Sequence, residues 1–342
     1  MPTNRKTRRS LLDVSTVLQR AWYQGGVVSR LLWPLGALFC GVVQLRRWTY
    51  GTGWLASDAA PVPVVIVGNI TVGGTGKTPL VAWLARHLLE RGYRPGVLTR
   101  GYRGEAVEWP QFVTADASAA HVGDEALLLA RRSGCPVVAG PDRGDDVRYL
   151  LERAECDIIL SDDGMQHYGL KRDVEIAVID GQRGLGNRLC LPAGPLREPV
   201  SRLHEVDLVI VNGTDKGRYP FAFQMQPTMA VNVKDPRITR PLDEFRGRTV
   251  TAVAGIGNPG RFFDGLRGKG LDVEGHAFPD HHPFRQEDLA PFGDGPLLMT
   301  EKDAVKCESW AADDWWYVAV ELDVEPAFVA QLDLILEGLN YG

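Results

Sequence analysis

Residues 62–78 read VPVVIVGNITVGGTGKT, and this stretch decides the fold of the chain. A short β-branched run, residues 62–67, precedes a glycine-rich turn, and an apolar stretch with helical periodicity, residues 79–89, follows it. The order of strand, glycine-rich loop and helix is the context of a Walker A phosphate-binding loop. We therefore predict an α/β domain around this segment.

The chemistry of such a loop assigns a role to its residues. Glycines let backbone N–H groups turn toward phosphate oxygens, and the helix N-terminus adds positive potential. Lys77 is expected on the β- and γ-phosphates of a nucleotide, and the Thr78 hydroxyl on Mg²⁺. The strict pattern has glycine where Thr71 stands, so the sequence departs from it at that position. The predicted nucleotide-binding residues are Gly73, Gly74, Thr75, Gly76, Lys77 and Thr78.

Strand and helix patterns alternate after this loop. The strand patterns cover residues 96–99, 136–139, 157–161, 175–179 and 207–211, and the helical patterns cover 125–132 and 145–153. Such alternation is typical of a parallel sheet with helices on both faces. A second α/β series begins near residue 249. We predict three parts: a membrane-associating segment at 1–60, a P-loop NTPase-like domain at 61–230, and a smaller α/β lobe at 231–342 whose last helix is able to pack back on the first lobe.

Composition and charge narrow the range of partners. The chain has 342 residues, of which 44% are hydrophobic and 24% charged, as in a globular protein. Its net charge of −5 gives no global electrostatic reason to bind nucleic acid. The five cysteines contain no C-x-x-C pair, which indicates neither a disulfide framework nor a zinc site and suits a reducing cytosol. We expect no nucleic-acid partner and no obligate protein partner.

The first sixty residues differ from the rest in charge and hydropathy. Arg5, Lys6, Arg8 and Arg9 form a basic start, and residues 31–45 carry no charge. As a helix that uncharged run spans about 22 Å, shorter than the ~30 Å hydrocarbon core, so a full crossing is not expected. The aromatic residues suited to a headgroup layer are Trp22, Tyr23, Trp33, Trp48, Tyr50 and Trp54. We favour an anchor in the membrane interface, and the alternative is a helix packed on the protein's own core.

Two acidic clusters accompany the phosphate loop. Asp162 and Asp163 follow the strand pattern 157–161, at the carboxyl edge of the predicted sheet, where a Walker B carboxylate would hold Mg²⁺. Asp124 and Glu125 open a helical pattern, where acidic residues also complement the helix dipole. From the residues alone, this capping role is the better interpretation of the second cluster.

Seven short motifs run along the chain in a fixed order. They are residues 68–69 with the loop GGTGKTP, 100–104 (RGYRG), 122–125 (VGDE), 162–167 (DDGMQH), 192–198 (PAGPLRE), 278–281 (FPDH) and 301–306 (EKDAVK). Together they resemble the tetraacyldisaccharide 4'-kinase family of lipid A synthesis, from about residue 15 to residue 306. The departure at Thr71 is shared with that family.

The resemblance implies an ATP- and Mg²⁺-dependent kinase that phosphorylates the 4'-hydroxyl of an acylated glucosamine disaccharide 1-phosphate. It implies a peripheral or monotopic enzyme, held by its N-terminal segment on the cytoplasmic face of the bacterial inner membrane. Asp124 is then the catalytic base with His281 as its partner, beside Lys77. The implied Mg²⁺ ligands are Thr78, Glu125 and Asp162. The residues implied at the acceptor are Asn69, Arg100, Gln166, His167 and Arg197.

A phosphate loop is also compatible with a membrane-associated GTPase or ATPase switch. Residues 212–215, NGTD, follow a strand pattern and resemble the guanine-reading N-K-x-D motif, but Gly213 replaces its lysine. A third hypothesis, a nucleotide-binding scaffold without turnover, leaves the acidic clusters unexplained. Dependence of ATP consumption on the lipid acceptor separates the three.

Overall fold

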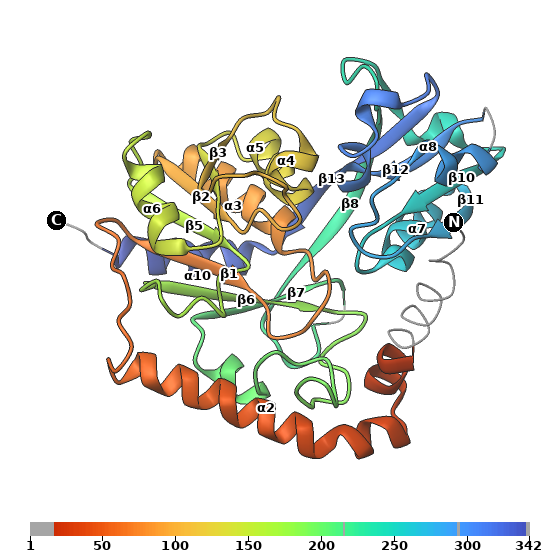
Figure 1. Ribbon diagram of the computed structural model, residues 1–342. Coiled ribbons are helices and arrows are strands. Elements are labelled where there is room, and N and C mark those ends of the chain that lie inside the picture. Colours follow the sequence, from red (N-terminus) through yellow and green to blue (C-terminus); the bar gives the residue numbers. More distant parts are fainter. Residues whose placement is uncertain (1–16, 215, 293–294, 340–342) are drawn as a thin grey trace.

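The computed structural model describes residues 17–214, 216–292 and 295–339 (Figure 1). The four basic residues at positions 5, 6, 8 and 9 and Asp215 of the NGTD segment lie outside these ranges. The first lobe denotes residues 61–230, and the second lobe denotes residues 231–339.

The first lobe is built on a parallel sheet with β1 at its centre. Its strands are β1 (Val64–Gly68), β2 (Pro95–Thr99), β4 (Val137–Ala139), β5 (Ile158–Asp162), β6 (Val174–Asp180) and β7 (Leu208–Asn212), with β3 (Gln111–Val113) antiparallel at the edge. β1 pairs in parallel with β5 on one side and with β6 on the other. The predicted P-loop type of α/β sheet is confirmed.

Helices cover both faces of this sheet. They are α3 (Lys77–Glu90), α4 (Ala119–Val122), α5 (Asp124–Arg132) and α6 (Arg143–Leu151). Val65 and Val67 of β1 pack in the core formed with α3 and α5, whereas Val64 and Ile66 pack in the core formed with α6. Because successive side chains of a strand point to opposite faces, β1 must be apolar throughout to fill both cores.

The second lobe has its own core around three parallel strands. Its elements are β10 (Thr249–Ala254), β11 (Asp272–Ala277), β12 (Leu297–Thr300), α7 (Pro259–Gly268), α8 (Gln286–Leu289) and α9 (Glu301–Ala304). Phe262, Phe263 and Leu266 of α7 pack against β10. β11 was not predicted, because it is an edge strand in which only Val273 is buried, and the rest of its sequence is polar or small.

Two long antiparallel strands join the lobes, β8 (Phe221–Asn232) and β13 (Trp315–Val324). β8 pairs with β7 through its first residues and with β9 (Thr239–Pro241) through its last, so the described strands form one continuous sheet of 13. Sequence analysis did not identify β8, which contains Pro227 opposite Val320, where the strand register shifts. Proline is tolerated within strands mainly at such irregularities. The boundary proposed near residue 230 falls inside β8, and the division into lobes stays a prediction.

The C-terminal helix α10 (Pro326–Glu337) packs on the first lobe. Phe328 is fully buried and meets Phe221 of β8 edge to face. Asp333 contacts Nε2 of His87 at 2.8 Å and Nη2 of Arg91 at 2.5 Å, both near the end of α3. After passing through the second lobe, the chain therefore ends in a helix that packs on the first lobe.

The N-terminal helix α2 (Val27–Gly51) lies along one side of the molecule (Figure 1). It has 25 residues, and by length and composition alone it is long and apolar enough to cross a membrane. The predicted length was wrong, because Arg46 and Arg47, which end the uncharged run, continue the helix.

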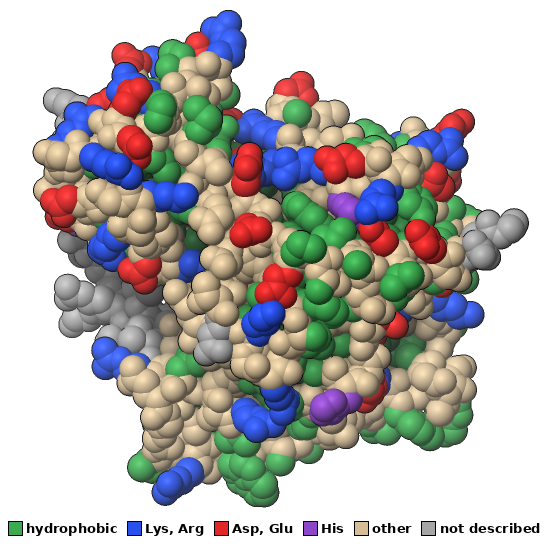
Figure 2. Space-filling view, turned by 180° about the vertical axis from the view of Figure 1, so that it is seen from behind, with side chains coloured by type: hydrophobic (Ala, Val, Ile, Leu, Met, Phe, Trp, Pro, Cys, Tyr) green, Lys and Arg blue, Asp and Glu red, His purple; other side chains and the backbone are tan. Residues whose placement is uncertain are grey.

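One face of α2 packs on the body of the protein and the opposite face is exposed. Ser29 and Gly36 are buried, and a Cβ on Gly36 would lie 2.8 Å from Cβ of Ala193. The exposed apolar stripe consists of Val27, Leu31, Leu35, Leu38, Val42, Leu45 and Trp48. Seen from behind, hydrophobic side chains gather along the lower edge, where Figure 1 places α2 (Figure 2). The three- and four-residue spacing of the stripe puts it on one side of the helix.

Candidate active site

The phosphate loop lies between the end of β1 and the start of α3, as its sequence predicts. Gly73 and Gly76 have φ values of 95° and 93°, which glycine adopts without strain. Nδ2 of Asn212, at the end of β7, donates a hydrogen bond of 2.9 Å to the carbonyl of Thr75. A Cβ on Gly76 would lie 2.3 Å from the same Nδ2. A larger residue at this position would therefore clash with the Asn212 side chain that holds the loop.

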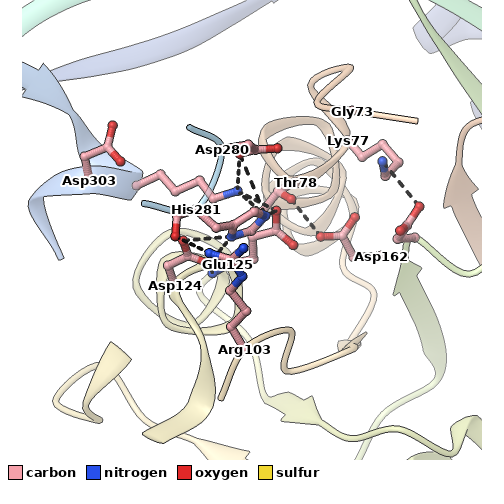
Figure 3. Close-up of polar contacts among 12 residues, drawn as sticks. Gly73, Lys77, Thr78, Arg103, Asp124, Glu125, Asp162, Asp280, His281 and Asp303 are labelled. Atoms are coloured by element: carbon pink, nitrogen blue, oxygen red, sulfur yellow. Dashed lines mark hydrogen bonds and ion pairs between the residues drawn. The ribbon is translucent and has the colours of Figure 1, made fainter. Parts of the chain in front are cut away.

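Lys77 and Thr78, the first residues of α3, face the end of β5. Nζ of Lys77 lies 3.2 Å from Oδ1 of Asn69 and 3.3 Å from Oδ1 of Asp163. Oγ1 of Thr78 donates a hydrogen bond of 2.8 Å to Oδ2 of Asp162 (Figure 3). The structure thus brings the predicted Walker A and Walker B residues together at the carboxyl edge of the sheet.

Asp162 is a buried carboxylate with capacity for a cation. It is 2% exposed, and among the described residues its Oδ1 has no hydrogen-bond partner. Burial, and after it the charge of Glu125, raises the pKa of Asp162 to about 7. A buried oxygen without a partner, next to a second carboxylate, suits a hard divalent cation. Thr78, Asp162 and Glu125 therefore fit the Mg²⁺ that the family resemblance implies.

Asp124 begins α5, and His281 lies in the loop after β11. Nδ1 of His281 is 3.1 Å from Oδ2 and 3.2 Å from Oδ1 of Asp124 (Figure 3). Oδ1 of Asp124 also accepts the backbone N–H of Glu125 at 2.9 Å, so this carboxylate serves the helix start and the interlobe contact at once. Burial opposes ionisation of Asp124, but His281 together with Lys302 and Lys306 keeps its pKa well below the usual range.

Two lysines of the segment after β12 reach across to α5. Nζ of Lys302 lies 2.8 Å from Oε1 of Glu125 and 3.1 Å from Nε2 of His281. Nζ of Lys306 lies 3.3 Å from Oδ2 of Asp124. Burial disfavours the charge on Lys302, but the carboxylates of Glu125 and Asp124 outweigh it and raise its pKa. The acidic start of α5 is thus neutralised from the second lobe.

Three residues of the site other than glycine have positive φ: Arg103 at 61°, Asp163 at 54° and His281 at 57°. Such a backbone costs about 1–2 kcal/mol for a residue with a Cβ, so its surroundings must hold it. The guanidinium of Arg103 donates to the carbonyl oxygen of His281, and the ring of Tyr102 meets the His281 ring edge-on at 4.8 Å. The RGYRG motif therefore fixes the loop that carries His281.

Three of the five residues expected at the acceptor meet beside Asp163. Nη1 of Arg197 lies 3.1 Å from Oδ2 of Asp163 and 3.3 Å from Oε1 of Gln166. Nε2 of Gln166 donates to the carbonyl of Asn69 at 3.1 Å. This chain of contacts connects the PAGPLRE and DDGMQH motifs to the phosphate loop.

The other two residues expected at the acceptor are His167 and Arg100, and the charge of Arg100 affects the pKa of His167. Burial, together with the positive charges of Arg143 and Arg100, lowers the pKa of His167 to about 4. His167 is therefore neutral at physiological pH. Arg100 directly follows β2 and is exposed.

The loop between β10 and α7 touches the phosphate loop. A Cβ on Gly257 would lie 2.4 Å from the backbone nitrogen of Gly74, so the two backbones approach too closely for any other residue there. The guanidinium of Arg183 donates to the carbonyl of Gly257 at 3.1 Å and also to the carbonyl of Gly74. The lobes therefore meet at the phosphate loop as well as at Asp124 and His281.

Sequence reasoning gave no role to Lys302, Lys306, Arg103 or Arg183. The first three belong to motifs that carry the family resemblance, and that membership was the available signal. Arg183 lies outside those motifs, so no sequence signal pointed to its role.

Comparisons with known proteins cover almost the whole chain. The model of the family "LpxK: Tetraacyldisaccharide-1-P 4'-kinase" matches residues 28–337. The tetraacyldisaccharide 4'-kinase of Nitrosococcus oceani is 50% identical over 325 residues, covering 95% of this chain and 96% of that protein. The enzyme of the same name from Pseudomonas aeruginosa is 48% identical over 332 residues, covering 96% and 99%.

A solved structure supports the same relationship. LpxK from Aquifex aeolicus, described as in complex with ATP, matches with a TM-score of 0.76 at 28% identity, covering 92% of this chain and 100% of that one. The family model, the near-full-length relatives and this structure agree with the order of the motifs. The chain belongs to the tetraacyldisaccharide 4'-kinase family.

Proposed function

We propose that this chain transfers the γ-phosphate of ATP to the 4'-hydroxyl of a tetraacylated glucosamine disaccharide 1-phosphate in lipid A biosynthesis. Its family makes it a phosphotransferase with an alcohol acceptor. The observation that carries the assignment of residues is that one site holds both the Thr78–Asp162 pair and the Asp124–His281 pair. Glu125 directly follows Asp124, and its charge raises the pKa of Asp162. The two pairs are therefore close neighbours.

Asp124 is the proposed base. As the acceptor oxygen bonds to the γ-phosphorus, the bond from that phosphorus to the β-phosphate oxygen breaks, ADP leaves, and the hydroxyl proton passes to Asp124. An ionised carboxylate is a weak base at neutral pH. Phosphoryl transfer depends more on positioning and charge neutralisation than on strong activation of the nucleophile, so orientation of the hydroxyl is the main contribution we assign to Asp124.

Thr78, Asp162 and Glu125 are the proposed Mg²⁺ ligands. Lys302 contacts Oε1 of Glu125, and the carboxylate has a second oxygen for a metal. Mg²⁺ held by these residues would neutralise charge on the β- and γ-phosphates. Lys77 would add a positive charge beside these phosphates. Its ammonium is held next to the phosphate loop by an ion pair with Asp163.

Arg197 is the proposed ligand of the acceptor's own phosphate. A guanidinium can bind phosphate through two parallel N–H donors, and Arg197 is already held in place through Nη1 by Asp163 and Gln166. Neutral His167 can exchange hydrogen bonds with sugar hydroxyls, while Asn69 and Arg100 complete the proposed surroundings of the disaccharide.

We place the enzyme on the cytoplasmic face of the inner membrane, attached peripherally or monotopically through α2. Its exposed apolar stripe suits the boundary between headgroups and acyl chains. Because the opposite face of α2 packs on the body through Ser29 and Gly36, a helix lying in the interface suits this arrangement better than a crossing helix.

The test is mass spectrometry of the acylated disaccharide after incubation with the protein, ATP and Mg²⁺ in detergent micelles. We expect a gain of one phosphate, and ATP consumption only when the acceptor is present. Lipid that already carries the 4'-phosphate is the matched control and should not stimulate consumption. ATP consumption that is indifferent to the acceptor would favour the switch hypothesis, and no consumption under either condition would favour the scaffold.

A further inference from the structure

We propose that Arg183 is a positioning residue for ATP, whose guanidinium holds the phosphate loop and the second lobe in one arrangement. The inference rests on the proposed function, in which the nucleotide bound by that loop is the phosphate donor. It is separate from the lobe contact at Asp124 and His281, because Arg183 acts on the loop that binds the nucleotide and not on the base.

The phosphate loop is held by two side chains that bind successive carbonyl groups. The guanidinium of Arg183 donates to the carbonyl of Gly74, and Nδ2 of Asn212 donates to the carbonyl of Thr75 at 2.9 Å. In a planar trans peptide the carbonyl and the following N–H point in opposite directions. The N–H groups of Thr75 and Gly76 are therefore turned away from these two side chains, as a loop that binds phosphate through its N–H groups requires.

Arg183 also contacts the second lobe, and it does so with a different nitrogen. Its Nη1 donates to the carbonyl of Gly257 at 3.1 Å, whereas its Nη2 donates to the carbonyl of Gly74. Gly257 lies in the loop between β10 and α7, and a Cβ there would lie 2.4 Å from the backbone nitrogen of Gly74. One planar group thus spans the contact between the lobes and sets the spacing of the two carbonyls that it binds.

Asp180, at the end of β6, holds the guanidinium in this position. Its carboxylate is 2% exposed and accepts the Nε–H of Arg183 at 3.0 Å. It also accepts two groups from the second lobe, Nη2 of Arg261 at 2.6 Å and Nδ2 of Asn258 at 3.3 Å. Nη2 of Arg261 further donates to the carbonyl of Asn212 at 3.2 Å. Both side chains that hold the phosphate loop are therefore connected to the second lobe.

These contacts couple the binding of ATP to the position of the second lobe. The loop must keep its conformation to bind phosphates, and Arg183 supports that conformation with a geometry that only the docked second lobe completes. A ligand that stabilises the loop then also stabilises the contact at Gly257, and the effect is equal in the reverse direction. We therefore expect a substitution on the second-lobe side of the contact to weaken ATP binding.

The first test is nucleotide affinity in the full-length protein in detergent micelles without the lipid acceptor. The probe is the non-hydrolysable β,γ-imido analogue of ATP with Mg²⁺, in an equilibrium binding measurement. Arg183→Met should raise its Kd by about tenfold or more, the scale of one hydrogen bond to a charged group. Arg188→Met, at an exposed position of the same loop, is the matched control and should bind like the wild type.

Arg183→Lys separates positioning from simple attraction of an anion. It keeps the charge but lacks the planar fork that binds two carbonyls, so its Kd should stay at least about fivefold above that of the wild type. A smaller loss would mean that charge alone accounts for Arg183, and it would overturn the proposal. Wild-type affinity in Arg183→Met would overturn it as well. Thermal unfolding of each variant checks that the losses do not come from unfolded protein.

Gly257→Ala keeps Arg183 and tests the second lobe directly. The added Cβ would lie 2.4 Å from the nitrogen of Gly74, so the two loops must move apart. Kd should rise by about fivefold or more, and adding Arg183→Met should raise it little further, because both changes break the same connection. Gly260→Ala is the control, since a Cβ there meets nothing closer than 3.6 Å. Additive losses in the double variant would contradict the coupling.

Hydrogen exchange shows where the coupling acts. In the wild type the analogue should slow amide exchange in residues 255–262 of the second lobe as well as in the phosphate loop. In Arg183→Met at saturating analogue, the phosphate loop should still be protected, whereas residues 255–262 should exchange as they do without nucleotide. Equal protection of residues 255–262 in the two proteins would show that the second lobe responds to nucleotide without Arg183, and the proposal would be wrong.

The two proposals fail separately. Affinity and exchange are measured without the acceptor, so the expected variant effects with no acceptor-dependent phosphorylation would reject the function and leave the role of Arg183 intact. Where phosphorylation is found, Arg183→Met should raise KM for ATP and leave KM for the lipid within about twofold. Phosphorylation with an unchanged KM for ATP in that variant would reject only the inference about Arg183.

Discussion

Thr78 and Asp162, 84 residues apart in the chain, are joined by a hydrogen bond of 2.8 Å from Oγ1 to Oδ2. The bond leaves Oδ1 of Asp162 buried and without a partner among the described residues. Two elements that meet at the carboxyl edge of the sheet thus present a hydroxyl and a carboxylate to the same point. Such a pair is suited to a Mg²⁺ ion that also binds nucleotide phosphates.

Asp162→Asn should raise the Mg²⁺ concentration needed for half-maximal activity by about tenfold or more, because a neutral amide replaces a charged ligand. The measurement is a Mg²⁺ titration of initial rates at saturating ATP. Asp157→Asn, at the opposite end of the same strand pattern and half-buried, is the control and should leave the titration unchanged. If the two variants titrate alike, Asp162 is a structural residue of the loop.

The exposed stripe of α2 leads to a second prediction. Replacing Leu35 and Leu38 by glutamate should release most of the protein from vesicles of anionic and zwitterionic phospholipid, because two charges must then enter the apolar boundary. Flotation through a density gradient measures the bound fraction. KM for the lipid should rise more than KM for ATP.

Gln44→Glu is the matched control for that experiment, since it adds a charge to an exposed position of α2 outside the stripe. It should float like the wild type. These substitutions are cleaner than removal of the whole segment, which would also uncover Ala193 and the core beneath Gly36. Unaltered flotation of the double glutamate variant would return α2 to the alternative of a helix that serves only the protein's own core.

His167 gives a prediction on stability and pH. Its pKa is lowered to about 4 in the folded chain, from an ordinary value near 6.5, by burial and by Arg143 and Arg100. The neutral form is therefore favoured by folding, and the resulting stability is present above pH 6.5 and is lost as the pH falls toward 4. Between pH 7 and pH 5 the loss should approach about 2 kcal/mol.

His167→Asn should lack this part of the acid sensitivity. Urea unfolding of the wild type and the variant at pH 7 and pH 5 measures the difference between them. His121→Asn, at an exposed site, is expected to follow the wild type at both pH values. A parallel fall in the wild type and His167→Asn would mean that other groups account for the pH dependence.

Local patterns explain which parts of the fold were accessible from sequence. β1, its loop and α3 could be predicted because glycines and a doubly buried strand leave a strong signal over few residues. β8 could not, since Pro227 interrupts the strand pattern and the strand is stabilised by pairing with the distant β13. α2 was predicted too short, because its last turns contain charged residues that are nevertheless helical. Their side chains extend into solvent or pair with the rest of the protein, as Arg47 does with Glu205.

The candidate site divides in the same way. Thr78 and Asp162 could be placed together from sequence, because neighbouring parallel strands bring their ends to one edge. The Asp124–His281 contact joins residues 157 apart in the chain, and only the family resemblance pointed to it. Lys302 had no assigned role, since its partners are set by how the second lobe docks on α5, which no local pattern encodes.

The contact between His281 and Asp124 supports a last prediction, on whether the two act as one unit. Asp124→Ala should lower kcat by about 10²–10⁴, because the hydroxyl loses the carboxylate that orients it and accepts its proton, and His281→Ala should lower it less. Both should leave KM for ATP within about twofold, since neither residue belongs to the phosphate loop and the loss is of transition-state stabilisation. Steady-state kinetics at saturating Mg²⁺ measure these values.

The double variant decides between joint and separate action. If His281 serves only to orient the Asp124 carboxylate, its removal costs nothing once that carboxylate is gone, and the double variant should match Asp124→Ala. The coupling energy then equals the whole effect of His281→Ala. Losses that add in the double variant would show that His281 contributes independently of Asp124, for example through its contact with Lys302. Thermal unfolding of all three variants, compared with the wild type, checks that the kinetic losses do not come from unfolded protein.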